Sequence, residues 1–219
     1  MNFHGFEIVW SQRDQMLSGL LLTLEIVAIS SVLAGILGFA VFGLLVQGGP
    51  AIVRPVKAAI DVIRAVPFML LCYLLYYGLP STGITLDNMT AGVTALAIYN
   101  AAYVAELLRG AWKAQPPEAD EAARAFGFHG WRLLVRIILP PVLLDAVPML
   151  GNQMIQVIKD SAFLVIITVE ELTYAANEIQ ATYYVPFASF ICAILLYWML
   201  CLGVEGGVRG LLRVAETRR

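Results

Sequence analysis

The chain has 219 residues, of which 60% are hydrophobic and only 14% are charged. A soluble domain of this length usually carries about 25% charged residues and less than half apolar ones, so this composition argues against a soluble protein. The length fits one domain, and the formal net charge of -2 points to neither a nucleic acid nor an acidic partner. The cysteines are odd in number and lie in apolar stretches, so we interpret Cys72, Cys192 and Cys201 as packing residues without disulfide or metal-ligand spacing.

The first apolar stretch lacks the features of a cleaved signal peptide. A signal peptide needs a basic start and a short apolar core of roughly 7–15 residues. No lysine or arginine precedes Arg13, and the run 26–46 is uncharged. That run matches the ~20 residues that a helix needs to cross the hydrocarbon core of a bilayer, so we expect a spanning helix here.

Five apolar segments are predicted to cross the membrane as helices, because every backbone polar group in lipid must be paired within its own segment. A soluble bundle of buried helices is the alternative, but uncharged runs such as 65–86 and 179–204 are long enough to span. We therefore expect an all-α integral membrane protein with a single transmembrane domain over residues 1–219. The predicted spans cover about residues 16–46, 52–79, 89–112, 137–159 and 186–208.

Lysine and arginine side chains are distributed unevenly between the loops, and their excess is expected on the cytoplasmic side. They cluster after the first, third and fifth predicted spans, which lie on one side of the membrane. The loops of the opposite side carry only Arg13, near the amino terminus. We therefore expect the amino terminus outside and the carboxyl terminus in the cytoplasm. The clustered residues are Arg54, Lys57, Arg109, Lys113, Arg124, Arg132, Arg136, Arg209, Arg213, Arg218 and Arg219.

The polar segment 113–136, between the third and fourth spans, is predicted to form two short helices. Two prolines open the first helix, acidic residues follow in its first turn, where the helix dipole favours negative charge, and Gly127 ends it. Phe128 and Trp131 give the second helix an apolar face, which indicates a partner protein that buries it. On composition alone, a solvated connector is an equal alternative. The acidic residues are Glu118, Asp120 and Glu121.

The same segment carries a long motif. Glu121-Ala122-Ala123 is followed after three residues by Gly127, and after nine more by Ile137-x-Leu139-Pro140. This spacing reproduces the EAA motif, and the chain resembles permease subunits of ABC importers of the polar amino acid type, whose solutes include histidine, glutamate, glutamine, arginine and opines. Segments 19–24, 63–67, 103–110, 148–152 and 159–161 are also similar to segments of that family.

The resemblance implies a type I ABC importer permease fold with five transmembrane helices. It also implies that segment 113–136 contains a coupling helix, which lies in a groove of the ATPase subunit and transmits its closure to the spans. Carried over to this chain, Glu121 would pair with a cation of the ATPase, and Gly127 would permit the close turn. The residues assigned to coupling are Asp120, Glu121, Ala122, Ala123 and Gly127.

The resemblance also implies a location in the bacterial cytoplasmic membrane, as a multi-pass protein, and a set of partners. These are ATP-binding cassette ATPase subunits, a second permease subunit in a homodimer or heterodimer, an extracytoplasmic solute-binding protein and membrane lipid. The chain has no G-x-x-x-x-G-K-[ST] segment, so we expect a non-catalytic subunit whose partner binds ATP and magnesium. We expect no metal site, cofactor site or nucleic-acid partner for this chain.

Asp160 is the leading candidate for the translocation path, because ionisable groups at membrane depth are costly and mark function. Asn152, Gln156, Lys159 and Asp160 recur at helical spacing and can share one face. We expect Asp160, Asn152 and Gln156 to contribute to a solute site, with Lys159 as neighbour or counter-charge. The alternative is a structural network in which Lys159 pairs with a carboxylate. Ser161, from the segment that resembles the family's K-D-T-S, belongs to the predicted path.

Other charged groups have simpler interpretations. Glu106 and Arg109 lie three residues apart near the inner end of the third span, so we expect a structural ion pair that Arg64 joins. The outer segment 170–178 is acidic, and its carboxylates either meet a binding protein or are simply solvated, which is the commoner case. Its acidic residues are Glu170, Glu171 and Glu178.

Two segments depart from the family's pattern by replacing polar groups with apolar ones. The family's R-G-T-P stands here as residues 64–67, Arg-Ala-Val-Pro, and its K-D-T-S-L as residues 159–163, Lys-Asp-Ser-Ala-Phe. Either the solute is less polar than usual, or this chain is the non-binding half of a heterodimer. A secondary transporter not driven by ATP is the alternative function, although no internal repeat is evident. Both histidines lie outside the spans, which argues against an intramembrane enzyme.

Overall fold

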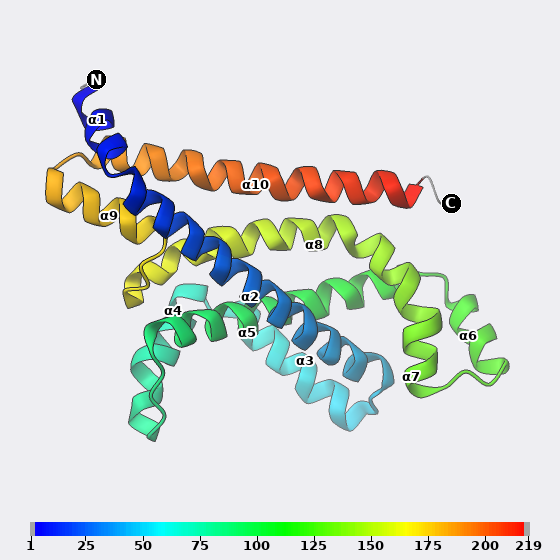
Figure 1. The fold of residues 1–219 in the computed structure, drawn as a ribbon. Helices are drawn as coiled ribbons and strands as arrows, with labels where there is room; N and C mark the ends of the chain where they lie inside the picture. Colours follow the sequence, from blue (N-terminus) through cyan, green and yellow to red (C-terminus); the bar gives the residue numbers. More distant parts are fainter. Residues whose placement is uncertain (1–2, 217–219) are drawn as a thin grey trace.

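A computed structural model describes residues 3–216 of the chain. All regular elements among these residues are helices, and the long ones run side by side in an elongated bundle (Figure 1). Within residues 3–216, four helices are long and apolar enough to cross a membrane, and a bent helix pair raises the number to as many as five. The predicted all-α class is therefore confirmed, and the number of candidate spans is compatible with the five expected.

The first spanning helix packs closely against the third predicted span. α1 (Phe3–Ser11) leads into α2 (Arg13–Gln47), which runs along α5 (Asn88–Lys113). At Gly38 of α2, an added Cβ would lie 2.7 Å from Val104 Cβ of α5 and 2.9 Å from the carbonyl oxygen of Ala101. Small residues permit such close helix approach in membranes, so this crossing requires glycine at position 38.

The second predicted span, about residues 52–79, is not one continuous helix. α3 (Pro50–Ala65) is followed by α4 (Phe68–Tyr73), and the segment Phe68–Thr82 that α4 begins is bent by 103° from α3. Pro67 explains the break, because proline has no backbone N–H and forces the preceding residue out of the helical region. Val66 accordingly has an extended ψ of 133°. The chain continues as the π-helical η1 (Leu74–Gly78) and the 3-10 helix η2 (Leu79–Thr82).

The second half of the chain alternates short and long helices. Asp87 caps α5 by accepting a hydrogen bond from the Thr90 backbone N–H at 3.0 Å, and hydrogen bonding to Thr90 lowers the pKa of this exposed carboxyl. The elements after α5 are α6 (Pro117–Ala125), α7 (Gly130–Leu133), the π-helical η3 (Leu134–Ile138), α8 (Leu139–Ser161), the 3-10 helix η4 (Ala162–Ile167), α9 (Leu172–Tyr183) and α10 (Pro186–Glu216).

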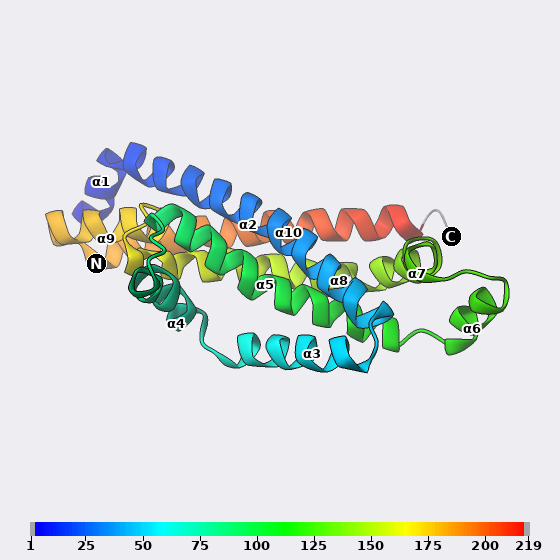
Figure 2. The same ribbon diagram turned by 90° about the horizontal axis from the view of Figure 1, so that it is seen from below.

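The bundle has two distinct ends. The turn between α2 and α3, the short helices α6 and α7, and the carboxyl end of α10 lie at one end, while α1 and α9 lie at the other (Figures 1 and 2). The first end collects basic residues from separate parts of the chain, and Arg13 begins α2 at the opposite end. Arg218 and Arg219, which entered the orientation prediction, lie outside the described residues. The basic residues of the first end include Arg54, Lys57, Arg124, Arg132, Arg209 and Arg213.

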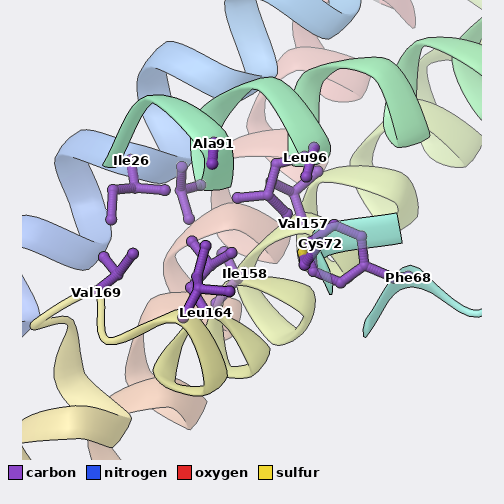
Figure 3. Packing of buried hydrophobic residues seen from close by; sticks show 12 residues of the cluster. Ile26, Phe68, Cys72, Ala91, Leu96, Val157, Ile158, Leu164 and Val169 are labelled. Atoms are coloured by element: carbon purple, nitrogen blue, oxygen red, sulfur yellow. The ribbon is translucent and has the colours of Figure 1, made fainter. Parts of the chain in front are cut away.

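The main hydrophobic core holds the bent segment on the bundle. Phe68 and Cys72 of α4 pack in one buried cluster with Leu96 of α5, Val157 of α8 and Leu164 of η4 (Figure 3). The bend after α3 therefore turns α4 inward, against α5 and α8. The arrangement brings α3 and α4 next to the part of α5 that carries the candidate site.

The three cysteines are free. Cys72 is fully buried, whereas Cys192 and Cys201 are half-buried among apolar side chains. This placement agrees with their interpretation as packing residues.

Candidate functional site

A cavity of about 410 Å³ lies between α5 and α8. Helix α5 contributes two aromatic rings and a leucine, and α8 contributes three amide side chains and a methionine. The amides give this side of the cavity hydrogen-bond donors and acceptors. The lining residues are Tyr99, Tyr103, Leu107, Met149, Asn152, Gln153 and Gln156.

The four residues predicted for the path have different positions in the structure. Asn152 and Gln156 line the cavity and are exposed on the surface of the single chain. Asp160 lies one helical turn beyond Gln156, is 3% exposed, and accepts a hydrogen bond from Gln156 Nε2 at 2.8 Å. Ser161 is buried, and its hydroxyl donates to the Ile158 carbonyl oxygen at 2.8 Å. Asn152 and Gln156 can therefore meet a solute directly, whereas Asp160 can act through Gln156.

Asp160 is an incompletely satisfied buried carboxyl group. Its second oxygen, Oδ2, is buried without a hydrogen-bond partner. Lys159 points to the exposed side of α8, and within residues 3–216 it makes no ion pair with a carboxylate. The alternative interpretation, a structural network in which Lys159 pairs with a carboxylate, is therefore not seen among these residues. A buried polar atom without a partner costs about 1–3 kcal/mol, so this oxygen does not contribute to the stability of the single chain.

The aromatic side of the cavity connects to the end of α3. The Tyr99 and Tyr103 hydroxyls lie 3.3 Å apart, and the Arg64 guanidinium lies 5.0 Å above the Tyr103 ring. Arg64 also approaches Glu106 at 4.0 Å, and Glu106 accepts two hydrogen bonds from Arg109. The expected group of Glu106, Arg109 and Arg64 is thus present, and it fixes α3 to α5 beside the cavity.

Sequence reasoning missed five of the seven lining residues, which are Tyr99, Tyr103, Leu107, Met149 and Gln153. Tyr99 and Tyr103 are one helical turn apart on α5, a spacing that places two residues on one face. Gln153 follows Asn152, but its contribution depends on the packing of α5 against α8. The spacing of the two tyrosines could therefore have indicated a shared helix face from the sequence alone, whereas no sequence pattern indicated Gln153.

At one end of the bundle, α6 presents the predicted coupling motif. Pro116 and Pro117 open the helix, and Glu118 and Asp120 occupy its first turn. Glu121 lies in the second turn, not in the first as expected. Trp112 Nε1 of α5 donates a hydrogen bond to Asp120 Oδ2 at 2.9 Å, which attaches α6 to the bundle.

The carboxyl end of α6 is closed by a glycine turn. Gly127 has a φ of +84°, and its N–H donates to the Arg124 carbonyl oxygen at 3.0 Å. The Phe128 N–H reaches back to the Ala123 carbonyl oxygen, also at 3.0 Å. This pair of bonds is a Schellman motif, which requires the left-handed conformation that glycine adopts without strain. The predicted stop at Gly127 is therefore present.

The two faces of α6 differ. Ala123 is buried against the core of the bundle, whereas Glu121 and Ala122 are exposed. Two neighbouring aromatic side chains are also exposed to solvent: Phe126 is 85% exposed and Trp131 is 62% exposed. Together Glu121, Ala122, Phe126 and Trp131 form a mixed acidic and apolar surface, hereafter the α6 surface, at this end of the bundle.

The acidic segment at the other end is only partly solvated. Glu170 and Glu178 are exposed, but Glu171 is fully buried, which corrects the expectation that all three are solvated or meet a partner. Glu171 caps α9 by accepting from the backbone N–H groups of Thr173 (2.9 Å) and Tyr174 (3.0 Å). Its Oε2 also accepts from the Tyr197 hydroxyl of α10 at 2.5 Å, and burial raises the pKa of this carboxyl.

Apolar helices, an amide-lined cavity between two of them and an exposed helical loop at one end together define a multi-pass membrane transport subunit. A family model described as "Binding-protein-dependent transport system inner membrane component" matches residues 40–213. The chain belongs to this family. The matched residues include both the cavity and the α6 surface.

Individual relatives agree with this assignment. The probable glutamine ABC transporter permease protein GlnM of Bacillus subtilis is 34% identical over 151 residues, which cover 69% of this chain and 70% of that protein. The glutamine transport system permease protein GlnP of Escherichia coli K12 is 34% identical over 180 residues, which cover 79% of this chain and 80% of that protein. The expected resemblance to ABC importer permeases, and with it the non-catalytic nature of the subunit, is confirmed.

Solved structures show the same fold. A chain from a crystal structure of an amino acid ABC transporter with histidines superposes with a TM-score of 0.86 at 29% identity, covering 95% of this chain and 97% of that one. A chain of the inward-facing MetNI methionine ABC transporter superposes with a TM-score of 0.73 at 20% identity, covering 90% and 95%. The second likeness concerns the fold alone.

Proposed function

We propose that this subunit forms the translocation path of an ABC importer for a polar amino acid or a similar solute, in the bacterial cytoplasmic membrane. The observation that carries the proposal is the cavity between α5 and α8, where amide side chains face an open space at the surface of the single chain. Relatives named for glutamine and arginine transport support the solute class.

The path uses exposed amide side chains, one of which is oriented by a buried residue of the same helix. Asn152 and Gln156 contact the solute, and Asp160 orients Gln156 through the hydrogen bond to its Nε2. Because Asn152 and Gln156 are exposed in the single chain, a second permease subunit, identical or different, completes the path by covering this side. Ser161 supports the end of α8 from its buried position.

The α6 surface couples the path to ATP hydrolysis on a separate ATPase subunit, which binds ATP and magnesium. Glu121 is exposed and free to pair with a cation of that subunit, and the neighbouring aromatic side chains bury their apolar area against it. Asp120, Ala123 and Gly127 hold α6 in shape, through the Trp112 bond, core packing and the glycine turn. Ala122 lies at the contact itself.

We infer the orientation of the bundle in the membrane from the distribution of its basic residues. The end of the bundle with the α6 surface carries the clustered lysines and arginines and lies in the cytoplasm, with the carboxyl terminus. The opposite end, with α1, α9 and the exposed Glu170 and Glu178, faces outward and receives an extracytoplasmic solute-binding protein.

Asp160→Asn tests the path. The variant is compared with wild type in vesicles that contain the purified importer, with glutamine or arginine as the labelled solute. Asparagine can turn its amide nitrogen toward Gln156, so the orientation of Gln156 is lost and uptake falls severalfold. Unchanged affinity and rate would remove Asp160 from the path. Wild-type uptake that needs no ATP would instead support a secondary transporter.

A further inference from the structure

α6 contacts the carboxyl end of α5 through one directional polar bond and through apolar packing. Trp112, in the last turn of α5, donates from its indole Nε1 to Asp120 Oδ2 of α6 at 2.9 Å. Ala123, about one turn further along α6, is buried in a core cluster to which α2, α5, η3 and α8 all contribute. The packing of Ala123 is therefore shared among several helices, whereas the hydrogen bond joins α6 to α5 alone.

The Trp112 side chain has a fixed direction. Its ring packs edge-on against the ring of Phe42 of α2, with the ring centroids 6.3 Å apart and the ring planes at 78°. Phe42 is fully buried in a close-packed core, so it leaves the indole little room to move. Edge-to-face packing of this kind favours one orientation of the ring, and the indole N–H is thereby directed at α6.

α5 connects this contact to the cavity as one continuous helix. It runs from Asn88 to Lys113 and contains no proline, which would kink it. Tyr103 and Leu107 of the cavity wall lie nine and five residues before Trp112, which is roughly 14 and 8 Å along the helix axis. A shift of the Trp112 end of α5 therefore moves the wall that these two side chains form.

The opposite wall of the cavity, α8, has a different attachment. Gln115, in the connection between α5 and α6, donates from its Nε2 to Asp145 Oδ2 of α8. Asp145 is exposed, so water competes for its carboxylate. Gln115 also lies outside α6, so its bond to α8 does not depend directly on the position of α6. Of the two hydrogen bonds, the one from Trp112 joins α6 itself to a wall of the cavity.

We infer that the hydrogen bond from Trp112 to Asp120 transmits movement of α6 to the α5 wall of the cavity, with Trp112 as the positioning residue. The inference rests on the proposed function and specifies which wall of the cavity follows the ATPase. Apolar packing at Ala123 has no preferred direction and lets α6 pivot. A directional bond at a second point fixes the orientation of α6 relative to α5, so the two helices move together.

Trp112→Phe tests the link in vesicles that contain the purified importer, where uptake of labelled glutamine or arginine and ATP hydrolysis are measured together. Phenylalanine keeps an aromatic ring against Phe42 and lacks the N–H donor. The ATPase is expected to copurify as with wild type, while solute uptake per ATP hydrolysed falls severalfold. Trp198→Phe is the matched control, because Trp198 of α10 is 58% exposed and its indole donates no hydrogen bond within residues 3–216. Equal ratios of uptake to hydrolysis in the two variants would overturn the inference.

Substitutions of Asp120 separate the hydrogen bond from the charge. Asp120→Asn keeps an oxygen that accepts from the indole, so the ratio of uptake to hydrolysis is retained. Asp120→Ala removes the acceptor and lowers the ratio as Trp112→Phe does. The two substitutions that break the bond, combined in one chain, lower the ratio no further than either alone. Equal loss in Asp120→Asn and Asp120→Ala, or additive losses in the double variant, would overturn the role of this bond.

Gln115→Ala tests the route to α8 and is expected to keep the wild-type ratio. A severalfold loss in Gln115→Ala together with a wild-type ratio in Trp112→Phe would assign the transmission to α8 and overturn the inference. Failure of wild-type uptake to depend on ATP would contradict the proposed function itself. Normal ATP-dependent uptake by wild type, with an unchanged ratio in Trp112→Phe, would contradict only the role of Trp112.

Discussion

Gly127 ends the coupling helix in a conformation that other residues adopt at a cost. Its φ of +84° lies in the left-handed region, which is unfavourable by about 1–2 kcal/mol for a residue with a Cβ. Gly127→Ala is expected to destabilise the turn after α6 and to lower solute uptake per ATP hydrolysed. Gly110→Ala is the matched control, because a Cβ at Gly110 of α5 meets no atom within 4 Å. Equal coupling in both variants would contradict a role for this turn.

Glu171 makes stability depend on pH. Burial raises its pKa above the ordinary value of 4.5, so the folded chain holds this proton more tightly than the unfolded chain. The stabilisation from the protonated form is complete below about pH 4.5 and is lost as pH rises through the raised pKa. Glu171→Gln should flatten this part of the pH profile of thermal unfolding in detergent. Glu170→Gln, at the exposed neighbour, should leave the profile as in wild type, and an unchanged slope in Glu171→Gln would disprove the assignment.

The sequence predicts residues with local partners better than residues with distant ones. The helix stop at Gly127 follows from the glycine itself, and the pair of Glu106 with Arg109 follows from helical spacing. The burial of Glu171 depends on Tyr197, which lies 26 residues away on another helix. In the same way, the position of Gln153 depends on Asn100 of α5, whose Oδ1 accepts a hydrogen bond from Gln153 Nε2 at 2.6 Å. Such contacts arise from helix packing, which hydropathy and spacing do not specify.

At the scale of elements, α4 is held inward by its buried side chains. Phe68 is 5% exposed in the main core, beside the Tyr99 ring, whereas Leu74 of η1 is 62% exposed. Phe68→Ala should lower the free energy of unfolding by about 3 kcal/mol or more, because it leaves a cavity in the core. Leu74→Ala should cost little. Denaturant unfolding in detergent checks both, and equal costs would show that α4 is not anchored through Phe68.

The α6 surface is the proposed contact with the ATPase subunit, so a charge change there is expected to weaken their association. Glu121→Lys reverses the charge expected to meet a cation of the ATPase, so copurification of the ATPase with this chain should fall severalfold. Glu178→Lys makes the same charge change on an exposed residue at the opposite end of the bundle and should leave copurification intact. Intact copurification with Glu121→Lys would place the contact elsewhere.

The break between α3 and α4 shows which features of a helical span the sequence predicts and which it does not. The sequence predicts one span over about 52–79, although four charged residues lie before the bend and none lies between residues 68 and 82. The dipeptide Val66-Pro67 does carry a local signal for a helix end. The angle of 103° and the inward turn depend on the core that receives Phe68, so they could not be predicted from composition.

For the whole molecule, the sequence predicts the all-helical class, the approximate spans and the family, because these depend on long apolar runs and one long motif. It does not predict which side chains meet across α5 and α8. Tyr99, Tyr103 and Gln153 reach the same cavity as Asn152 and Gln156 only because these two helices pack side by side.

The central claim is that a solute path in this chain is driven by a separate ATPase through α6. The most direct measurement follows solute uptake and ATP hydrolysis together in vesicles that contain the purified importer, with residues 121–127 either native or scrambled. We predict that uptake requires ATP, and that scrambling abolishes uptake while the helical content of the spans is preserved. Uptake at full rate with the scrambled segment, or without the ATPase subunits, would contradict the claim.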